Sequence, residues 1–136
     1  MMRQISRKEV SPVEQKEQLT PTQILNSLHG FIGSEQFYRI YPNVIITEGV
    51  KFLCDQANCF WLIDCIYSYQ TIKKVAVETF QVIDLTVDLA NHTGLIVVTD
   101  GNEVELMRQE LEFTDFPLSQ IRLYYTDSTV LLPREY

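Results

Sequence analysis

The sequence predicts an α+β fold, with N-terminal helices packed on one face of a C-terminal antiparallel β-meander. Two observations indicate this class. Apolar residues recur with helical spacing in the first half of the chain, whereas from residue 78 onward they alternate with polar residues, as in half-buried strands. The length of 136 residues, with 46% hydrophobic and 21% charged residues, suits one ordinary globular domain, which we place at 19–136.

The N-terminal region contains two helix-start signals of different strength. Residues 1–18 are polar and charged, and we expect a flexible or short-helical tail there, because Ser11 to Glu14 has the form of a capping box. The run from Thr20 to Gln23 is stronger, since it combines a capping threonine, a proline at the first helical position and a glutamine that can reach back to the cap. It predicts a helix over 21–29, which Gly30 ends in a left-handed conformation.

The middle of the chain predicts two further helices. Residues 36–41 are aromatic and β-branched and favour a short strand or an extended loop, which Pro42 interrupts. Thr47 is a suitable cap for the next helix, and Asn58 is a plausible end. Residues 59–69 are apolar on nearly all sides, as in a buried central helix.

The second half predicts the strands of the meander. The first runs to residue 89 with apolar residues at every second position, and Asn91 to Gly94 supplies a turn. Asp100-Gly101 signals a tight hairpin, and Asp127-Ser128 a second turn. The remaining strands are expected at 95–99, 102–112, 121–126 and 130–132.

The net charge of −7 is concentrated in this half. Residues 75–117 contain nine acidic residues and one basic residue, Arg108. Nucleic-acid binding needs clustered lysine and arginine, so this distribution disfavours it. The acids are either a solvated sheet face with its edges or a surface for a basic protein partner. The candidate partner-binding residues are Asp84, Asp88, Glu103, Glu105 and Glu112.

Asp64 is the candidate for chemistry, because it is the acid within the apolar run 59–69. Desolvation raises the pKa of a carboxyl group, so Asp64 could serve as a general acid or base in a pocket of a small metal-independent hydrolase or ligand-binding enzyme. The alternative is a structural acid that bonds a tyrosine or neighbouring backbone, or that lies at the solvent edge of the helix.

Other reactive residue types do not form a recognisable constellation. The spacing of Cys54, Cys59 and Cys65 matches no metal site, so we expect core packing and no metal or other cofactor. His29 fits a helix C-terminus and His92 an exposed turn. The longest apolar run is too short to span a bilayer and no secretory signal is recognised, so the sequence predicts a soluble, cytoplasmic protein without membrane contact.

Four short motifs carry a resemblance. They are TEGVKFL (Thr47–Leu53), FWLID (Phe60–Asp64), TDFPL (Thr114–Leu118) and LPREY (Leu132–Tyr136). Together they resemble a family of small uncharacterised bacterial proteins, a domain of unknown function. The resemblance covers roughly Phe31 to the C-terminus and implies a single domain, with no activity, cofactor or site residue to transfer.

The functional expectation therefore comes from charge and composition. We expect a non-enzymatic protein-interaction or regulatory module with an acidic sheet surface, which binds a basic protein partner or forms a homodimer. Tyrosine is enriched at interfaces, so Tyr41, Tyr124 and Tyr136 could line a groove or a dimer contact.

Overall fold

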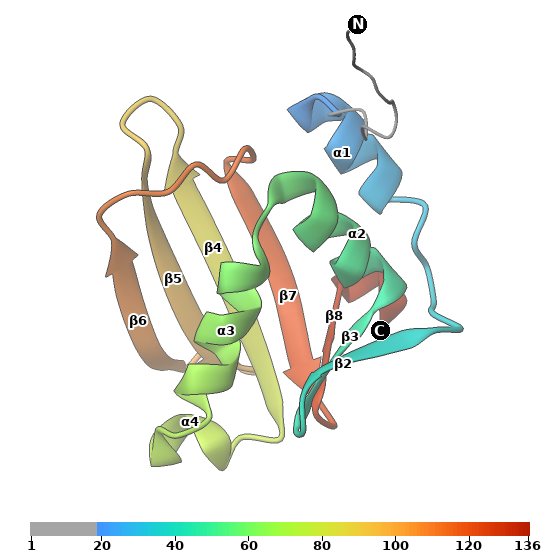
Figure 1. Ribbon diagram of the computed structural model, residues 1–136. Coiled ribbons are helices and arrows are strands. Elements are labelled where there is room, and N and C mark those ends of the chain that lie inside the picture. The colour runs from blue at the N-terminus through green and yellow to red at the C-terminus, as the bar shows by residue number, and fades with distance from the viewer. Residues whose placement is uncertain (1–18) are drawn as a thin grey trace, which may run out of the picture.

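The computed structural model describes residues 19–136, which form an α+β fold around one seven-stranded sheet (Figure 1). The expected tail at 1–18 lies outside the described residues. The helices are α1 (Pro21–Leu28), α2 (Glu48–Ala57), α3 (Phe60–Tyr69), the short α4 (Lys73–Ala76) and the C-terminal 3-10 helix η1 (Pro133–Glu135). The strands are β2 (Phe37–Tyr41), β3 (Val44–Thr47), β4 (Phe80–Asp88), β5 (Thr93–Asp100), β6 (Glu105–Leu111), β7 (Gln120–Thr126) and β8 (Thr129–Leu131).

The sheet has the strand order β2-β3-β8-β7-β4-β5-β6, so the expected simple meander is wrong. Neighbouring strands are antiparallel except β3 and β8, which run parallel, and the sheet is therefore mixed. The difference begins at Pro42, which was expected to interrupt a single strand. It lies instead in the turn of a hairpin between β2 and β3, and β3 then pairs with a strand more than 80 residues away in the chain, Thr129–Leu131.

Helices α2 and α3 lie on one face of the sheet (Figure 1). As the sequence predicts, Thr47 caps α2, where it accepts a hydrogen bond from the backbone N–H of Val50, and Asn58 ends the helix. Asn58 has the left-handed conformation, with φ 54°. The inward sides of both helices and of the central strands form one core cluster. Its members include Val50, Leu53, Leu62, Ile63 and Ile66 from the helices and Ile83, Leu85, Ile96, Val98 and Leu123 from the strands.

Helix α3 differs from the all-round buried helix that its apolar sequence predicted. It buries one side against the sheet and exposes the other, where Asp64, Tyr67 and Ser68 lie. The physical reason is that a single sheet face offers one layer of packing, so an apolar helix laid on it still has a solvent side.

Two turn predictions also need correction. Helix α1 ends at His29 in a right-handed conformation, and no glycine among the described residues has a positive φ, so the left-handed stop at Gly30 is wrong. The β5–β6 connection is a longer loop with Glu103 at φ 69°, held by the Asp100 carboxylate, which accepts hydrogen bonds from the backbone N–H groups of Asn102 and Val104. Side-chain capping by Asp100 thus replaces the tight glycine turn.

Candidate functional site

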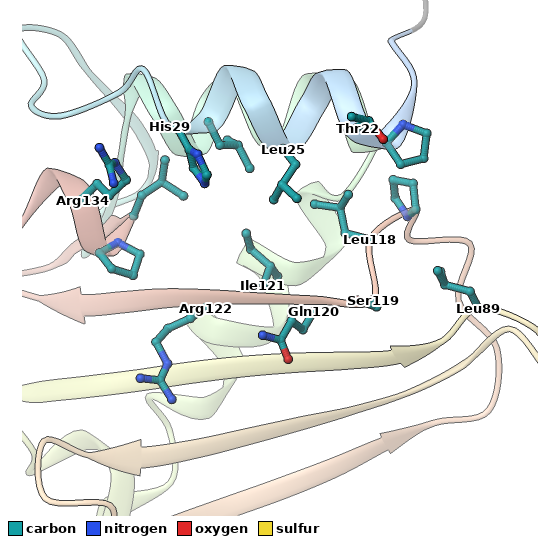
Figure 2. A pocket seen from close by; sticks show the side chains of 15 residues that line it. Thr22, Leu25, His29, Leu89, Leu118, Ser119, Gln120, Ile121, Arg122 and Arg134 are labelled. Atoms are coloured by element: carbon teal, nitrogen blue, oxygen red, sulfur yellow. The ribbon is translucent and has the colours of Figure 1, made fainter.

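The candidate functional site is a groove between α1, the first half of β7 and the C-terminal segment that leads into η1 (Figure 2). Its volume is about 570 Å³. The floor comes from Ser119 to Arg122, and the opposite wall comes from α1. Leu89 lies at one end and Arg134 at the other, and Pro117, Leu132 and Pro133 also line the groove. We call this feature the α1–β7 groove.

The groove exists because β7 lacks a strand neighbour over half of its length. On one side β7 pairs with β4 from Gln120 to Thr126. On the other side β8 pairs only with Tyr124, Tyr125 and Thr126. Among the described residues, no strand pairs with 120–123 on that side, and this unpaired stretch borders the groove.

Backbone alternation identifies which polar groups face the groove. The carbonyl of Ser119 accepts a hydrogen bond from the N–H of Val87. The backbone N–H and C=O groups of Ser119 and of every second residue after it therefore point toward β4. Gln120 and Arg122 therefore present their backbone N–H and C=O groups to the groove. The two-residue turn after Thr126 agrees with this, because it makes Thr126 a hydrogen-bonded partner of Thr129 on the β8 side. Arg122 lies four residues before Thr126, so its backbone groups point to the same side of β7.

Pro133 stops β8 from continuing along β7. The next hydrogen-bonded pair after Tyr124 and Leu131 would join Arg122 to residue 133, and proline has no N–H to donate. The chain turns instead into η1. A short stretch of β7 backbone is thereby left open to a ligand.

The lining of the groove is apolar and carries cations but no acid. The apolar side chains include Leu25, Leu118 and Ile121, and Leu25 is 45% exposed at the rim. The polar members include two arginines, Arg122 and Arg134, whereas none of the 15 lining residues is aspartate or glutamate. In a chain with 18 acidic and 11 basic residues, this surface favours an anionic or neutral apolar ligand.

The Glu135 carboxylate fixes the wall formed by η1. It accepts hydrogen bonds from the Thr47 hydroxyl at 2.6 Å, the Leu132 N–H at 3.0 Å and the Gly49 N–H at 3.1 Å. Thr47 and Gly49 lie at the N-terminus of α2, where a negative charge is favourable. We call this contact the Glu135 latch. It joins the TEGVKFL and LPREY motifs in space.

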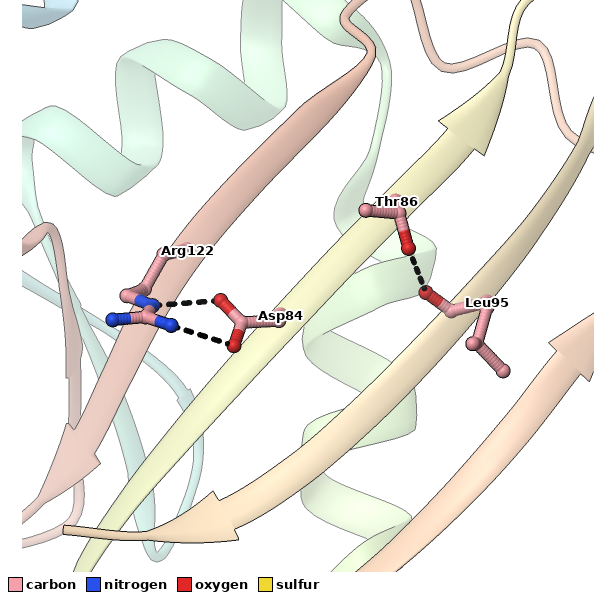
Figure 3. A network of polar contacts seen from close by, with 4 residues as sticks. All are labelled: Asp84, Thr86, Leu95 and Arg122. Carbon is pink, nitrogen blue, oxygen red and sulfur yellow. Dashed lines mark hydrogen bonds and ion pairs between the residues drawn. The ribbon is translucent and has the colours of Figure 1, made fainter. Parts of the chain in front are cut away.

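The sequence-predicted acids are spread over the sheet and are mostly paired within the chain. Asp84 forms a bidentate ion pair with Arg122, at 2.7 and 3.0 Å, next to the Thr86 hydroxyl that donates to the Leu95 carbonyl (Figure 3). Glu105 pairs in the same way with Arg108, whose hydrogen bonds lower the pKa of Glu105.

The other predicted acids lie at turns and ends of strands. Asp88 accepts hydrogen bonds from the side chain and backbone of Asn91, and these hold its pKa below the ordinary range. Glu103 and Glu112 are exposed near the ends of β6, which is an edge strand. Charges there discourage pairing with another sheet, so the acids have an internal explanation as well as a possible external one.

Asp64 lies on the exposed side of α3. Its carboxylate accepts a hydrogen bond from the Tyr41 hydroxyl, and the Tyr41 ring stacks on Tyr67 with a centroid distance of 3.8 Å. The bond to Asp64 raises the pKa of the Tyr41 phenol. This arrangement matches the structural alternative, a tyrosine bond at the solvent edge, and Asp64 lacks the burial that the acid–base interpretation requires.

The other residues with candidate roles lie apart from one another. Tyr124 and Tyr136 pack edge to face, together with Phe80, on the sheet face opposite α2 and α3, whereas Tyr41 stacks with Tyr67 of α3. His92 is exposed in its turn, as expected, and His29 lines the α1–β7 groove. The cysteines are free; Cys54 and Cys59 are buried and Cys65 is half-buried. Among residues 19–136, no group of three or more histidine, cysteine, aspartate or glutamate side chains is placed to hold a metal ion.

Sequence reasoning missed the groove and the Glu135 latch. The available signals were Pro133 directly after a predicted strand, and the presence of TEGVKFL and LPREY in one motif set. Neither signal shows that part of β7 has no strand beside it.

In the described part of the chain, none of the helices has the length and apolarity needed to cross a bilayer.

Comparison with known proteins supplies a family but no activity. A family model described as a family of unknown function (DUF6876) matches residues 22–136. Searches among curated proteins and among solved structures gave no match.

Proposed function

We propose that this protein, which belongs to DUF6876, a family of unknown function, is a non-enzymatic protein-interaction module. It takes an extended peptide segment of a partner protein into the α1–β7 groove, as an added strand beside β7. The observation that carries the proposal is the unpaired stretch of β7, which faces an apolar groove of about 570 Å³.

Strand addition suits both surfaces of this groove. The backbone groups of Gln120 and Arg122 supply ladder hydrogen bonds to any peptide main chain. Alternate side chains of an added strand point to opposite faces, so one set can pack against the apolar lining. The exposed rim residues Leu25 and Leu89, at 45% and 48%, lose accessible surface when the groove is filled.

The acidic residues on and beside the edge strand β6 also bear on this proposal. Glu105, Glu110 and the neighbouring Glu112 lie exposed on or beside β6, and their charges discourage pairing at that edge of the sheet. Their charge would also steer a partner with basic residues outside the bound segment. Basic residues of the partner outside the bound segment would lie near the acidic half of the sheet. The bound segment itself would lie next to Arg122 and Arg134 in the groove.

The test is selection of binders from a displayed random hexapeptide library, followed by affinity measurements with the synthetic peptides. Leu25→Glu places a charge in the apolar rim and should weaken the selected peptides at least about tenfold, because burying an unpaired carboxylate is costly. Ile32→Glu is the matched control, since Ile32 is 72% exposed and outside the groove lining. It should leave affinity unchanged.

Two outcomes would overturn the proposal. One is a library that yields no binder for the wild-type protein. The other is a set of binders that ignore Leu25→Glu but are lost when Glu103, Glu105 and Glu112 are all changed to glutamine, which would move the binding surface to the acidic edge.

A further inference from the structure

We propose that the α1–β7 groove selects the C-terminal end of its peptide, with the terminal carboxylate bound at Arg134. This inference rests on the proposed function, because it names the kind of peptide that the groove accepts. It has two independent supports, the closure of the groove at one end and the charge at that end.

The groove is closed where η1 meets β7. An added strand beside Gln120 and Arg122 lies in line with β8, which already occupies β7 from Tyr124 onward. Leu132 and Pro133 form the wall at this end. A strand that enters from the Leu89 end therefore has space for only a few residues before it must stop or leave the sheet. A chain terminus meets this requirement without a turn.

The charge at the closed end is positive. Arg134 and His29 lie on the same side of the groove in Figure 2, away from Leu89 and Thr22 at the other end. Arg134 is exposed and forms no ion pair with another described residue. The carboxylate of the adjacent Glu135 is held by Thr47, Leu132 and Gly49, so it accepts their hydrogen bonds rather than one from Arg134.

The second arginine of the groove is already neutralised. The Arg122 guanidinium gives two hydrogen bonds to Asp84, so its charge is paired within the chain. A guanidinium that has no ion-pair partner among residues 19–136 and lies beside a closed wall is suited to a carboxylate, which it can bind through two parallel hydrogen bonds. Arg134 is therefore the residue that binds the terminal carboxylate of the peptide.

The same geometry sets the direction of the peptide. Strand β7 runs from Gln120 toward Tyr124, and so toward the closed end. A peptide with its carboxylate at the closed end runs in the same direction and pairs parallel with β7. The residues that precede the carboxylate lie over Leu118 and Ile121, and apolar side chains are favoured there.

The test compares each selected hexapeptide as the free acid and as the C-terminal amide, with fluorescence anisotropy as the readout. We expect the amide to bind at least about tenfold more weakly to the wild-type protein, as the loss of a charge-assisted hydrogen bond implies. Arg134→Gln should weaken the free acid by a similar factor and leave the amide unchanged. Arg39→Gln, the same charge change on the exposed strand β2, is the control and should affect neither form.

A second measurement reports strand addition separately from the carboxylate. Amide hydrogen exchange of Gln120 and Arg122 should slow when peptide binds, whereas that of Ile121, which already faces β4, should change little. Equal binding of acid and amide, together with this slowing, would refute selection of the C-terminus but keep the interaction module. Self-association that Leu25→Glu abolishes, without binding of any peptide, would give the groove to a second copy and overturn the inference.

Discussion

Removing the Glu135 latch should destabilise the protein and weaken the groove at the same time. In Glu135→Ala, the Thr47 hydroxyl and the N–H groups of Leu132 and Gly49 lose one shared charged acceptor. A hydrogen bond to a charged group contributes about 1.5 to 3 kcal/mol, but these bonds share one half-buried carboxylate, and water can replace part of them. We therefore expect a loss of about 2 to 3 kcal/mol in the free energy of unfolding, or roughly 6 to 12 °C in Tm for a chain of this size.

The assay is urea unfolding followed by circular dichroism, with the same samples used for peptide affinity. Glu135→Gln should lose about half as much stability, because its amide oxygen still accepts whereas its NH₂ group faces a donor. The reasoning would be refuted if Glu135→Ala unfolded within about 0.5 kcal/mol of the wild type, the size of an ordinary surface substitution.

Gly49→Ala tests the same latch from the helix side. A Cβ at this position would lie 2.6 Å from Leu132 Cδ1 and 2.9 Å from Glu135 Oε2, so the latch must move. Alanine is better than glycine inside a helix by about 0.5 to 1 kcal/mol, and this gain is smaller than the loss of the latch. A net loss of stability of about 1 kcal/mol is the expected result, and a gain would show that the latch contributes little.

Two further predictions concern residues outside the groove. Asp64→Asn should lower the pKa of Tyr41 toward its ordinary value near 10, measured by absorbance at 295 nm. Because the folded-state pKa of Tyr41 is raised, its contribution to stability is present below about pH 10 and is lost as pH rises through the folded value, so the wild type should lose more stability in alkali than the variant. The Cys59 and Cys65 thiols should resist iodoacetamide at pH 8 on the time scale that labels the urea-unfolded chain. A hydrogen bond with Cys54, together with burial, raises the pKa of Cys59, and burial raises the pKa of Cys65. Rapid labelling of the native chain at Cys59 or Cys65 would contradict this.

The sequence predicted those elements whose causes are local. Thr20 and Gln23 exchange the two hydrogen bonds of a capping box at the start of α1, and both partners are three residues apart. Strand β4 follows its alternation, with Ile83, Leu85 and Val87 buried in the core cluster. Signals of this kind depend on side chains that are close in the chain, and they persist in the folded protein.

The mixed sheet depended on contacts that no local pattern contains. Strand β3 has four residues, and its place is fixed by parallel pairing of Ile45 and Ile46 with Thr129 and Val130. The surroundings of Asp64 also depend on a distant contact. Its neighbours in sequence are apolar, but the partner that decides its environment is the Tyr41 hydroxyl, 23 residues away. Burial is a property of the assembled layers rather than of the adjacent sequence.

The groove exists because residues 120–123 of β7 have no strand beside them on one side, and two features of the chain keep that side unpaired. Pro133 lacks the N–H that the ladder would need opposite Arg122, and Glu135 draws the following residues to the start of α2. If both features are required, the double variant Pro133→Val and Glu135→Gln should let β8 continue along β7. The Arg122 amide would then exchange slowly without any peptide, and the selected hexapeptides would lose affinity even though Leu25, Leu118 and Ile121 of the lining are unchanged. If the Arg122 amide still exchanged fast in this variant, the open edge would have a cause other than these two residues, and the account of how the fold keeps the groove open would be wrong.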